Sequence, residues 1–331
     1  MSTRTRTGAA ASTRAQALEL IGSAERFVVV THEHPDGDAL GSLVAMHIGL
    51  SALGKESVMF MSADEFPLPR EYRFFKLEGL VSVMPGDLGE RVAVLLDCGN
   101  IDRNAAAVQH ELDPLLNVDH HHDNTMFGTI NYVVPEASCT AEIVWDLLSE
   151  LGVTLTRPLA EALYVGLLTD TGRFSYENTG STAHRMAAEL VESGIDVAAI
   201  HHQIYEGFPF AKLELLGRAL QKVVRYDEGK LAVAFLTAED YEQTGAEDSF
   251  SEGIIDHLRA IEGTQVAVLV RDLLSEDRRG QKKVSLRATG NDVDVSAIAR
   301  EHGGGGHRRA AGFTTDLPLA ELVETLRARL Q

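Results

Sequence analysis

Histidine and aspartate gather in two short segments of the N-terminal half of the chain. One segment, THEHPDGD, covers residues 31–38, and the other, DHHHDN, covers residues 119–124. Burying so many polar side chains costs several kcal/mol unless something satisfies them, and a metal ion or a phosphate held by imidazoles would do so. We therefore expect a ligand site. The alternatives are a solvated loop or, for the first segment, a helix start capped by Asp38.

Two isolated aspartates extend this set. Asp97 follows the apolar run RVAVLL of residues 91–96, and Asp170 lies near the end of a predicted helix that begins at Pro158. Turn chemistry is one explanation for Asp97, and a helix end closed by Gly172 is one for Asp170. However, an aspartate at the C-terminus of a helix opposes the helix dipole, which indicates that Asp170 is kept for another reason.

Together these positions offer six metal ligands and no thiolate. Six ligands with shared carboxylates suit two divalent cations about 3.5–4 Å apart. Mixed oxygen and nitrogen ligation favours manganese, with magnesium, cobalt or iron as alternatives. Such a pair lowers the pKa of a bridging water and stabilises the attacking and leaving oxygens of a displacement at phosphorus. The ligands are two imidazoles and four carboxylates: His32, Asp36, Asp38, Asp97, His120 and Asp170.

A glycine-rich segment near the C-terminus is the second candidate site. Residues 302–312 read HGGGGHRRAAG, and residues 278–310 carry eight Lys or Arg against three Asp or Glu, in a chain whose formal net charge is −19. Glycines let backbone N–H groups approach an anion closely, and arginine binds phosphate through two parallel hydrogen bonds. We expect this segment, with Arg287 on a preceding strand, to bind a phosphate or nucleotide. A flexible turn is the alternative.

The elements that position these residues alternate along the first half of the chain. Apolar runs predict strands at residues 27–31, 57–61, 91–96 and 115–118, and a helical pattern covers residues 38–53. This alternation predicts a parallel sheet with helices on both faces. Helical patterns dominate residues 138–217. Strands return at residues 231–236, 265–270 and 283–288. The predicted fold class is α/β, with an N-terminal parallel-sheet domain, a helical connector and a smaller C-terminal α/β domain.

Length and composition bound the class of protein. The 331 residues suggest about two domains, which we place at 15–192 (catalytic) and 218–331 (substrate-binding), after a disordered tail over 1–14 and with a connector over 193–217. Two cysteines argue against a disulfide scaffold. The acidity argues against wrapping long nucleic acid but not against a small phosphorylated ligand. Without an expected signal peptide or membrane span, we expect a soluble, cytoplasmic protein. A homodimer stays open.

Taken in order, the motifs resemble those of the DHH phosphoesterase superfamily. They are HEHPDGDALGS at 32–42, Asp97, DHHHDN at 119–124 and TDTG at 169–172, and the glycine-rich segment resembles the signature of the DHH-associated C-terminal domain. The chain is similar to the bacterial two-domain, NrnA-like group. This resemblance implies a manganese-dependent phosphodiesterase and exonuclease that degrades very short oligoribonucleotides (nanoRNA) to mononucleotides. It also implies 3′-phosphatase activity on adenosine 3′,5′-bisphosphate.

The resemblance also implies roles for single residues. His32 and Asp36 would hold one cation, with Asp170 completing that site. Asp38 and His120 would hold the other cation, and Asp97 would bridge the two. His121 would contact the scissile phosphate or protonate the leaving oxygen. The substrate's terminal phosphate or nucleotide would be bound by Arg287, Gly304, Gly305, Gly306, His307 and Arg308.

Two departures from the family pattern and several other activities remain open. His34 stands where many members have Asn, which could alter metal choice, and Ala288 stands where Ser is common. The other activities are hydrolysis of linear or cyclic diadenylate, pyrophosphatase or exopolyphosphatase chemistry, and RecJ-like exonuclease action on single-stranded DNA. This last activity usually requires a longer chain. A nucleotide-sensing protein with an inactive site is the non-enzymatic alternative, and the six ligands argue against it.

Overall fold

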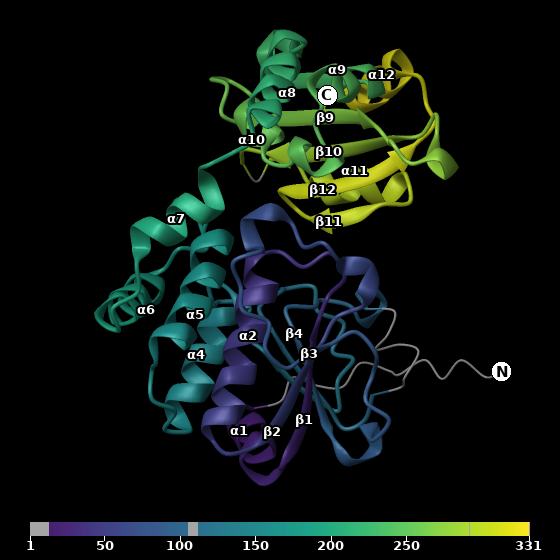
Figure 1. The fold of residues 1–331 in the computed structure, drawn as a ribbon. Helices are drawn as coiled ribbons and strands as arrows, with labels where there is room; N and C mark the ends of the chain where they lie inside the picture. The colour runs from purple at the N-terminus through teal and green to yellow at the C-terminus, as the bar shows by residue number, and fades with distance from the viewer. Residues whose placement is uncertain (1–12, 105–111, 291, 331) are drawn as a thin grey trace, which may run out of the picture. The chain divides into compact units, whose positions relative to one another are not determined.

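The structure is a computed structural model that describes residues 13–104, 112–290 and 292–330. The chain divides into two compact units between Glu206 and Gly207, each with a six-stranded sheet (Figure 1). Of the predicted tail over 1–14, residues 1–12 lie outside the described part. The prediction is wrong for Thr13 and Arg14, because they begin the first helix: the Thr13 side chain accepts from the N–H of Gln16, and Gln16 reciprocates.

The first unit is built on a parallel sheet with the strand order β3-β2-β1-β4-β5-β6. The strands are β1 (Arg26–Thr31), β2 (Glu56–Phe60), β3 (Leu80–Val81), β4 (Val92–Leu96), β5 (Leu115–Asp119) and β6 (Ile130–Val133). The helices are α1 (Arg14–Ser23), α2 (Gly37–Ala52), α4 (Thr140–Glu150), α5 (Arg157–Asp170), α6 (Ser181–Glu192) and α7 (Val197–Tyr205). The predicted α/β class is therefore confirmed. The two-residue strand β3 and the short strand β6 are additions that the apolar pattern did not indicate.

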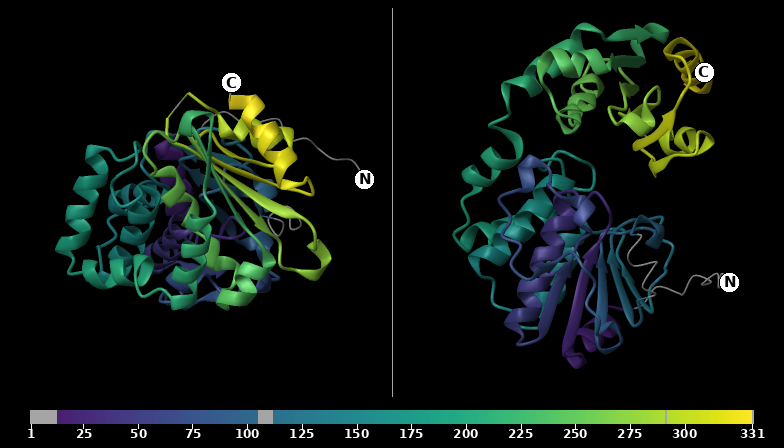
Figure 2. Two further views of the ribbon diagram at one scale, coloured as in Figure 1. Left: turned by 90° about the horizontal axis from the view of Figure 1, so that it is seen from above. Right: turned by 45° about the vertical axis from the view of Figure 1, so that its right-hand side comes forward.

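Successive side chains of the buried strands enter two different cores. Phe27 and Val29 of β1 pack into the larger core, which α1, α2, α4 and α5 cover (Figure 2). Val28 and Val30 point to the opposite face. In the described residues, this second face is covered by loop side chains and by the short 3-10 helices η3 (Leu88–Glu90) and η4 (Ile101–Arg103) rather than by α-helices. Two further 3-10 helices are η1 (Ala63–Glu65) and η2 (Arg70–Tyr72).

The second unit has a mixed sheet with the strand order β11-β12-β10-β9-β8-β7, in which only the β8–β9 pair is parallel among the described strands. Its strands are β7 (Val224–Tyr226), β8 (Leu231–Leu236), β9 (Val266–Asp272), β10 (Lys282–Ala288), β11 (Gly305–His307) and β12 (Ala310–Thr315). Its helices are α8 (Phe210–Gln221), α9 (Ala238–Thr244), α10 (Ile254–Arg259), α11 (Val295–Glu301) and α12 (Leu319–Leu330), with η5 (Asp227–Gly229), η6 (Asp248–Ser251) and η7 (Glu276–Arg278).

Helices cover both faces of this second sheet. Residues of α8, α9 and α10 pack on one face, and residues of α11 and α12 pack on the other. The connector predicted over 193–217 is not a separate element, because α7 belongs to the first unit and α8 to the second. Within the described residues, every helix is too short or too polar to cross a bilayer.

Helices α2 and α5 cross with almost no space between their backbones. A Cβ atom on Gly41 would lie 2.5 Å from the carbonyl oxygen of Ala162 and 2.9 Å from the backbone nitrogen of Gly166. A Cβ on Gly166 would lie 2.7 Å from Oδ1 of Asp38. Both distances are shorter than atoms tolerate, so these glycines set how closely the two helices approach. We call the contact of Gly41 with Gly166 the glycine seam.

The glycine seam predicts a stability difference between two glycine-to-alanine substitutions. Gly41→Ala forces backbone apart in a packed core and is expected to destabilise the first unit by about 1–3 kcal/mol. Gly22→Ala in α1 is the control, because nothing lies within 4 Å of its Cβ position and alanine favours a helix. Urea unfolding followed by fluorescence of Trp145, the single tryptophan, measures both. Equal midpoints for the two variants would contradict the role of the seam.

Candidate metal centre

The sheet of the first unit brings the predicted ligand segments to one place. Strand order runs outward in both directions from the neighbouring strands β1 and β4, which makes their carboxyl ends a topological switch point, where open α/β sheets bind ligands. His32 directly follows β1, Asp97 directly follows β4, and His120 directly follows β5. Since β1, β4 and β5 are parallel neighbours, these three side chains meet at the same edge.

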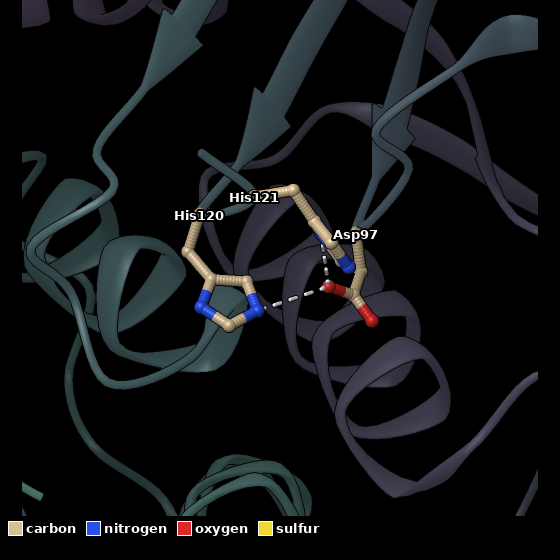
Figure 3. Close-up of side chains that lie close together, drawn as sticks. All are labelled: Asp97, His120 and His121. Carbon is tan, nitrogen blue, oxygen red and sulfur yellow. Dashed lines mark ion pairs between the residues drawn. The ribbon is translucent and has the colours of Figure 1, made fainter. Parts of the chain in front are cut away.

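Asp97 lies at the middle of this cluster and has an unusual backbone. Its φ of 57° is in the left-handed region, which residues other than glycine seldom adopt. The carboxylate is buried. Its oxygens lie 3.7 Å from Nε2 of His32, 3.7 Å from Nε2 of His120 and 3.6 Å from Nδ1 of His121. Figure 3 shows the two neighbouring histidines converging on it. The backbone strain is consistent with a functional position, because the surrounding fold has to hold it.

One group of potential ligands consists of His32, Asp36 and Asp97, whose ligand atoms all lie within 4.8 Å of one another. Nδ1 of His32 lies 2.8 Å from the carbonyl oxygen of Glu33, which leaves Nε2 directed at the cluster. Oδ1 of Asp36 accepts from the N–H groups of Asp38 and Ala39 at 3.1 Å each. Asp36, and not Asp38, is therefore the cap of α2.

A second group consists of Asp38, His120 and Asp170, again within 4.8 Å. Asp38 is 1% exposed, and its carboxylate accepts from the N–H groups of Thr140 at 2.7 Å and Ala141 at 2.9 Å, at the start of α4. Nε2 of His120 lies 3.6 Å from Oδ2 of Asp170. Asp170 ends α5, so the helix dipole disfavours its charge, and a cation beside it would reverse that penalty.

The two groups share no residue and together contain all six predicted ligands. They differ from the family pattern in one respect: Asp170 lies with Asp38 and His120 rather than completing the group of His32 and Asp36. The reason is the glycine seam, which brings the end of α5 beside the start of α2. A third group, of Asp97, His120 and His121, also lies within 4.8 Å. However, Nδ1 of His121 is already 2.7 Å from Oδ1 of Asp119.

Burial and mutual repulsion shape the charges of the centre. Burial raises the pKa of Asp38 well above its ordinary value, and the neighbouring carboxylates add to the rise. Burial likewise raises the pKa of Asp170 to about 7. Burial acts in the same direction on Asp97, but the attraction of His32, His121 and His120 outweighs it, so the pKa of Asp97 is lowered. Crowded, buried oxygen ligands with imidazoles at their side fit divalent cations.

A buried amide network holds the second histidine segment. Nδ2 of Asn124 donates to Oδ2 of Asp119 at 2.6 Å and to the carbonyl oxygen of Cys98 at 3.1 Å. Asn117, on β5, donates to Oδ1 of Asn124 at 3.0 Å and to Oδ1 of Asn131 at 3.1 Å. Although burial would lower it, the pKa of His121 is raised to about 9 by Asp119 and Asp97. The network therefore fixes His121 in orientation and favours its charged form.

Some of these supporting residues were not predicted from the sequence. Asn117 and Asn131 are fully buried, and an amide inside an otherwise apolar strand is the signal that could have revealed them. Asn178 donates to Oδ2 of Asp170 at 3.1 Å. Thr140 donates its hydroxyl to Oδ1 of Asp97 at 3.0 Å. These last two contacts join segments that are separated in the chain, and local patterns do not indicate them.

Two cysteines border the centre without entering the three ligand groups of the described residues. Cys98 follows Asp97 and donates its thiol to the carbonyl oxygen of Asn100 at 2.9 Å. Burial raises the pKa of Cys98 to about 12. Burial also raises the pKa of Cys139, at the start of α4, well above its usual range. Both side chains are buried thiols.

The predicted extra imidazole of His34 lies outside these groups as well. Its side chain is 90% exposed and Nδ1 is 3.3 Å from Glu65. The backbone N–H of His34 donates to the same carboxylate at 2.8 Å. The contact with Glu65 turns the side chain away from the ligand groups, so the structure gives His34 no direct part in choosing a metal.

The predicted substrate-binding residues lie on one edge of the second unit's sheet. The glycine-rich segment is not only a loop, because Gly305–His307 forms strand β11 at the end of the strand order. Register pairs His307 with Ala310, and Ala310 with Arg287, so Arg287 stands two strands in from the edge. A Cβ on Gly304 would lie 2.2 Å from the carbonyl oxygen of Gly312, which explains the need for glycine there. Arg308 is exposed.

Comparison with known proteins matches both units. The model of the DHH family, N-terminal domain, matches residues 26–167, and that of the DHHA1 domain matches residues 228–331. The bifunctional oligoribonuclease and PAP phosphatase NrnA of Thermus thermophilus is 34% identical over 288 residues, which cover 86% of this chain and 83% of that protein.

Solved structures share the fold. An exopolyphosphatase-related protein from Bacteroides fragilis superposes with a TM-score of 0.85 at 24% identity, covering 96% of this chain and 95% of the other. RecJ from Thermus thermophilus in complex with Mn²⁺ superposes with a TM-score of 0.53 at 17% identity, covering 96% of this chain and 53% of RecJ.

Charge crowding predicts that neutralising one ligand stabilises the metal-free protein. In chelator-treated protein, Asp170→Asn removes one of four neighbouring charges, and its amide oxygen can still accept from Asn178. We expect a higher Tm than wild type, by about 2–4 °C for each kcal/mol of relief. Saturating Mn²⁺ is expected to stabilise wild type by about 2.7 kcal/mol at 100 times Kd and the variant by much less.

Differential scanning calorimetry with and without Mn²⁺ measures both effects. Asp123→Asn is the control, because Asp123 is an exposed neighbour outside the three ligand groups. If Asp170→Asn kept the full manganese shift and melted no higher than wild type after chelation, Asp170 would not be a ligand in a crowded anionic centre.

Proposed function

The chain belongs to the DHH family and is a hydrolase of phosphoester bonds, and on that premise we propose that it degrades very short oligoribonucleotides to mononucleotides, using two bound divalent cations. The observation that carries the proposal is the division of six predicted ligands into two groups of three at the switch point. The name of the Thermus thermophilus relative, an oligoribonuclease and PAP phosphatase, supports the choice of substrate and a second, 3′-phosphatase activity on adenosine 3′,5′-bisphosphate.

Each group would hold one cation. His32, Asp36 and Asp97 supply one nitrogen and two carboxylates, and Asp38, His120 and Asp170 supply the same set. Manganese suits this mixture of ligands, and the RecJ structure that shares the fold is a complex with Mn²⁺. Bound in this way, a pair of cations lowers the pKa of a coordinated water and stabilises charge on the phosphoryl oxygens.

The protein's own groups have three further tasks. His121, held by Asp119 at 2.7 Å, would contact the scissile phosphate or donate a proton to the leaving oxygen. Backbone amides at the start of α4 hold Asp38 in place, so that ligand geometry exists before substrate arrives. In the second unit, Arg287, Arg308, His307 and the glycines 304–306 would bind the terminal phosphate of the substrate.

Hydrolysis of a diribonucleotide tests the proposal. With a 5′-labelled diribonucleotide and Mn²⁺, wild type is expected to release mononucleotides, and Asp97→Ala is expected to lose at least about 100-fold in kcat, because both groups adjoin this carboxylate. A substrate panel with pyrophosphate, polyphosphate, diadenylates and adenosine 3′,5′-bisphosphate separates the alternative activities. Full activity of Asp97→Ala, or no turnover by wild type with any divalent cation, would refute the assignment.

A second substitution tests the role of the other unit. Arg287→Ala removes a charged hydrogen bond to phosphate and is expected to raise KM about 10–100-fold, with a smaller effect on kcat. Arg185→Ala is the control, because Arg185 is exposed on α6 and bonds only to hydroxyls of its own helix in the contacts described. An unchanged KM in Arg287→Ala, measured with the labelled diribonucleotide, would remove Arg287 from the binding site.

A further inference from the structure

The loop that follows the ligand Asp170 has a strained backbone. Gly172, Arg173 and Phe174 have φ values of 54°, 62° and 62°, so three consecutive residues are left-handed, two of them with side chains. Such conformations are costly, and they persist only where the surroundings determine them. We call residues 171–179 the strained loop. Its position beside a metal ligand raises the question of what its shape presents there.

Several contacts hold the strained loop in this one shape. The ring of Phe174 stacks on His184, with centroids 5.3 Å apart, and its N–H donates to the hydroxyl of Thr171 at 3.1 Å. The guanidinium of Arg173 lies 4.8 Å from the centre of the Tyr205 ring. The N–H of Tyr176 donates to the carbonyl oxygen of Thr171 at 2.9 Å. The loop is therefore ordered before any ligand binds.

What the loop presents is Tyr176. A Cβ atom on Gly172 would lie 2.3–2.5 Å from Cζ, Cε1 and Cε2 of this ring, so one side of the ring rests on the Gly172 backbone. The residue is nevertheless 41% exposed. An aromatic ring that is fixed on one side and open on the other offers a rigid surface for stacking. Gly172 is needed both for its left-handed φ and for this close approach.

The strained loop is tied directly to the metal centre. Nδ2 of Asn178 donates to Oδ2 of Asp170 at 3.1 Å and to the carbonyl oxygen of Ser138 at 2.7 Å. Gly172 is two residues from Asp170, so their Cα atoms are at most about 7.6 Å apart. The open side of Tyr176 therefore lies within the reach of a nucleotide whose phosphate is held at the ligand groups.

We propose that Tyr176 stacks against a nucleobase of the substrate. This inference rests on the proposed function, because it assumes a nucleotide phosphate at the metal centre. Stacking on an aromatic ring does not distinguish strongly among bases, which suits an enzyme that removes short RNA of any sequence. Pyrophosphate and polyphosphate have no base to stack, so Tyr176 favours nucleotides over them at a metal centre that would otherwise serve both.

The test compares two ligands that differ only in the base: adenosine 5′-monophosphate and ribose 5-phosphate. Calorimetric binding is measured with Mn²⁺ present for wild type, Tyr176→Leu and Tyr176→Phe. Tyr176→Leu is expected to weaken binding of the adenosine nucleotide about tenfold or more and to leave ribose 5-phosphate unchanged. Tyr176→Phe keeps the ring and is expected to bind both ligands as wild type does.

Manganese titration of each variant shows whether Asp170 has been disturbed. If Tyr176→Leu fails to fold or loses manganese, Tyr176→Trp decides: stacking predicts nucleotide affinity at least equal to wild type, whereas a purely structural tyrosine predicts a loss. Equal weakening of both ligands in Tyr176→Leu, or none, overturns the inference. Turnover of the diribonucleotide by the same wild-type sample tests the proposed function separately, because the binding comparison does not depend on hydrolysis.

Discussion

The structure depends on keeping four carboxylates together where water screens them poorly. Asp38 and Asp97 are almost completely buried, and Asp36 and Asp170 contribute charge to the same cluster. Like charges in such surroundings disfavour ionisation. The fold offsets part of this cost with imidazoles around Asp97 and with backbone N–H groups at Asp36 and Asp38. The remaining negative charge is what draws divalent cations, so the instability of the bare site and its affinity for metal have one cause.

The distribution of the ligands along the chain gives the centre its rigidity. Three segments come from the ends of parallel strands, whose register fixes their separation. The other ligands come from the start of α2 and the end of α5, and the glycine seam sets the separation of these helices. Because both devices are made of backbone, side-chain motion in the core does not change the spacing of the ligands. Packing and chemistry are therefore coupled through very few contacts.

Much of this arrangement could be predicted from the sequence, and the failures have identifiable causes. Polar residues that directly follow apolar strands must meet at one edge of a parallel sheet, which is why His32, Asp97 and His120 could be brought together without coordinates. The cap of α2 and the grouping of Asp170 could not, since both depend on a helix crossing between residues over a hundred positions apart. The bond from Thr140 to Asp38 and the edge strand formed by the glycines are of the same kind.

The two buried thiols have a consequence for how the protein withstands oxidation. Peroxides and disulfides react with thiolates, and a thiol that stays protonated reacts slowly. Cys98 and Cys139 adjoin the centre, yet both are buried and held far from ionisation. Redox-active manganese or iron could therefore occupy the neighbouring positions without sulfur chemistry following, and the sulfurs serve as small apolar packing groups rather than as a point of oxidative damage.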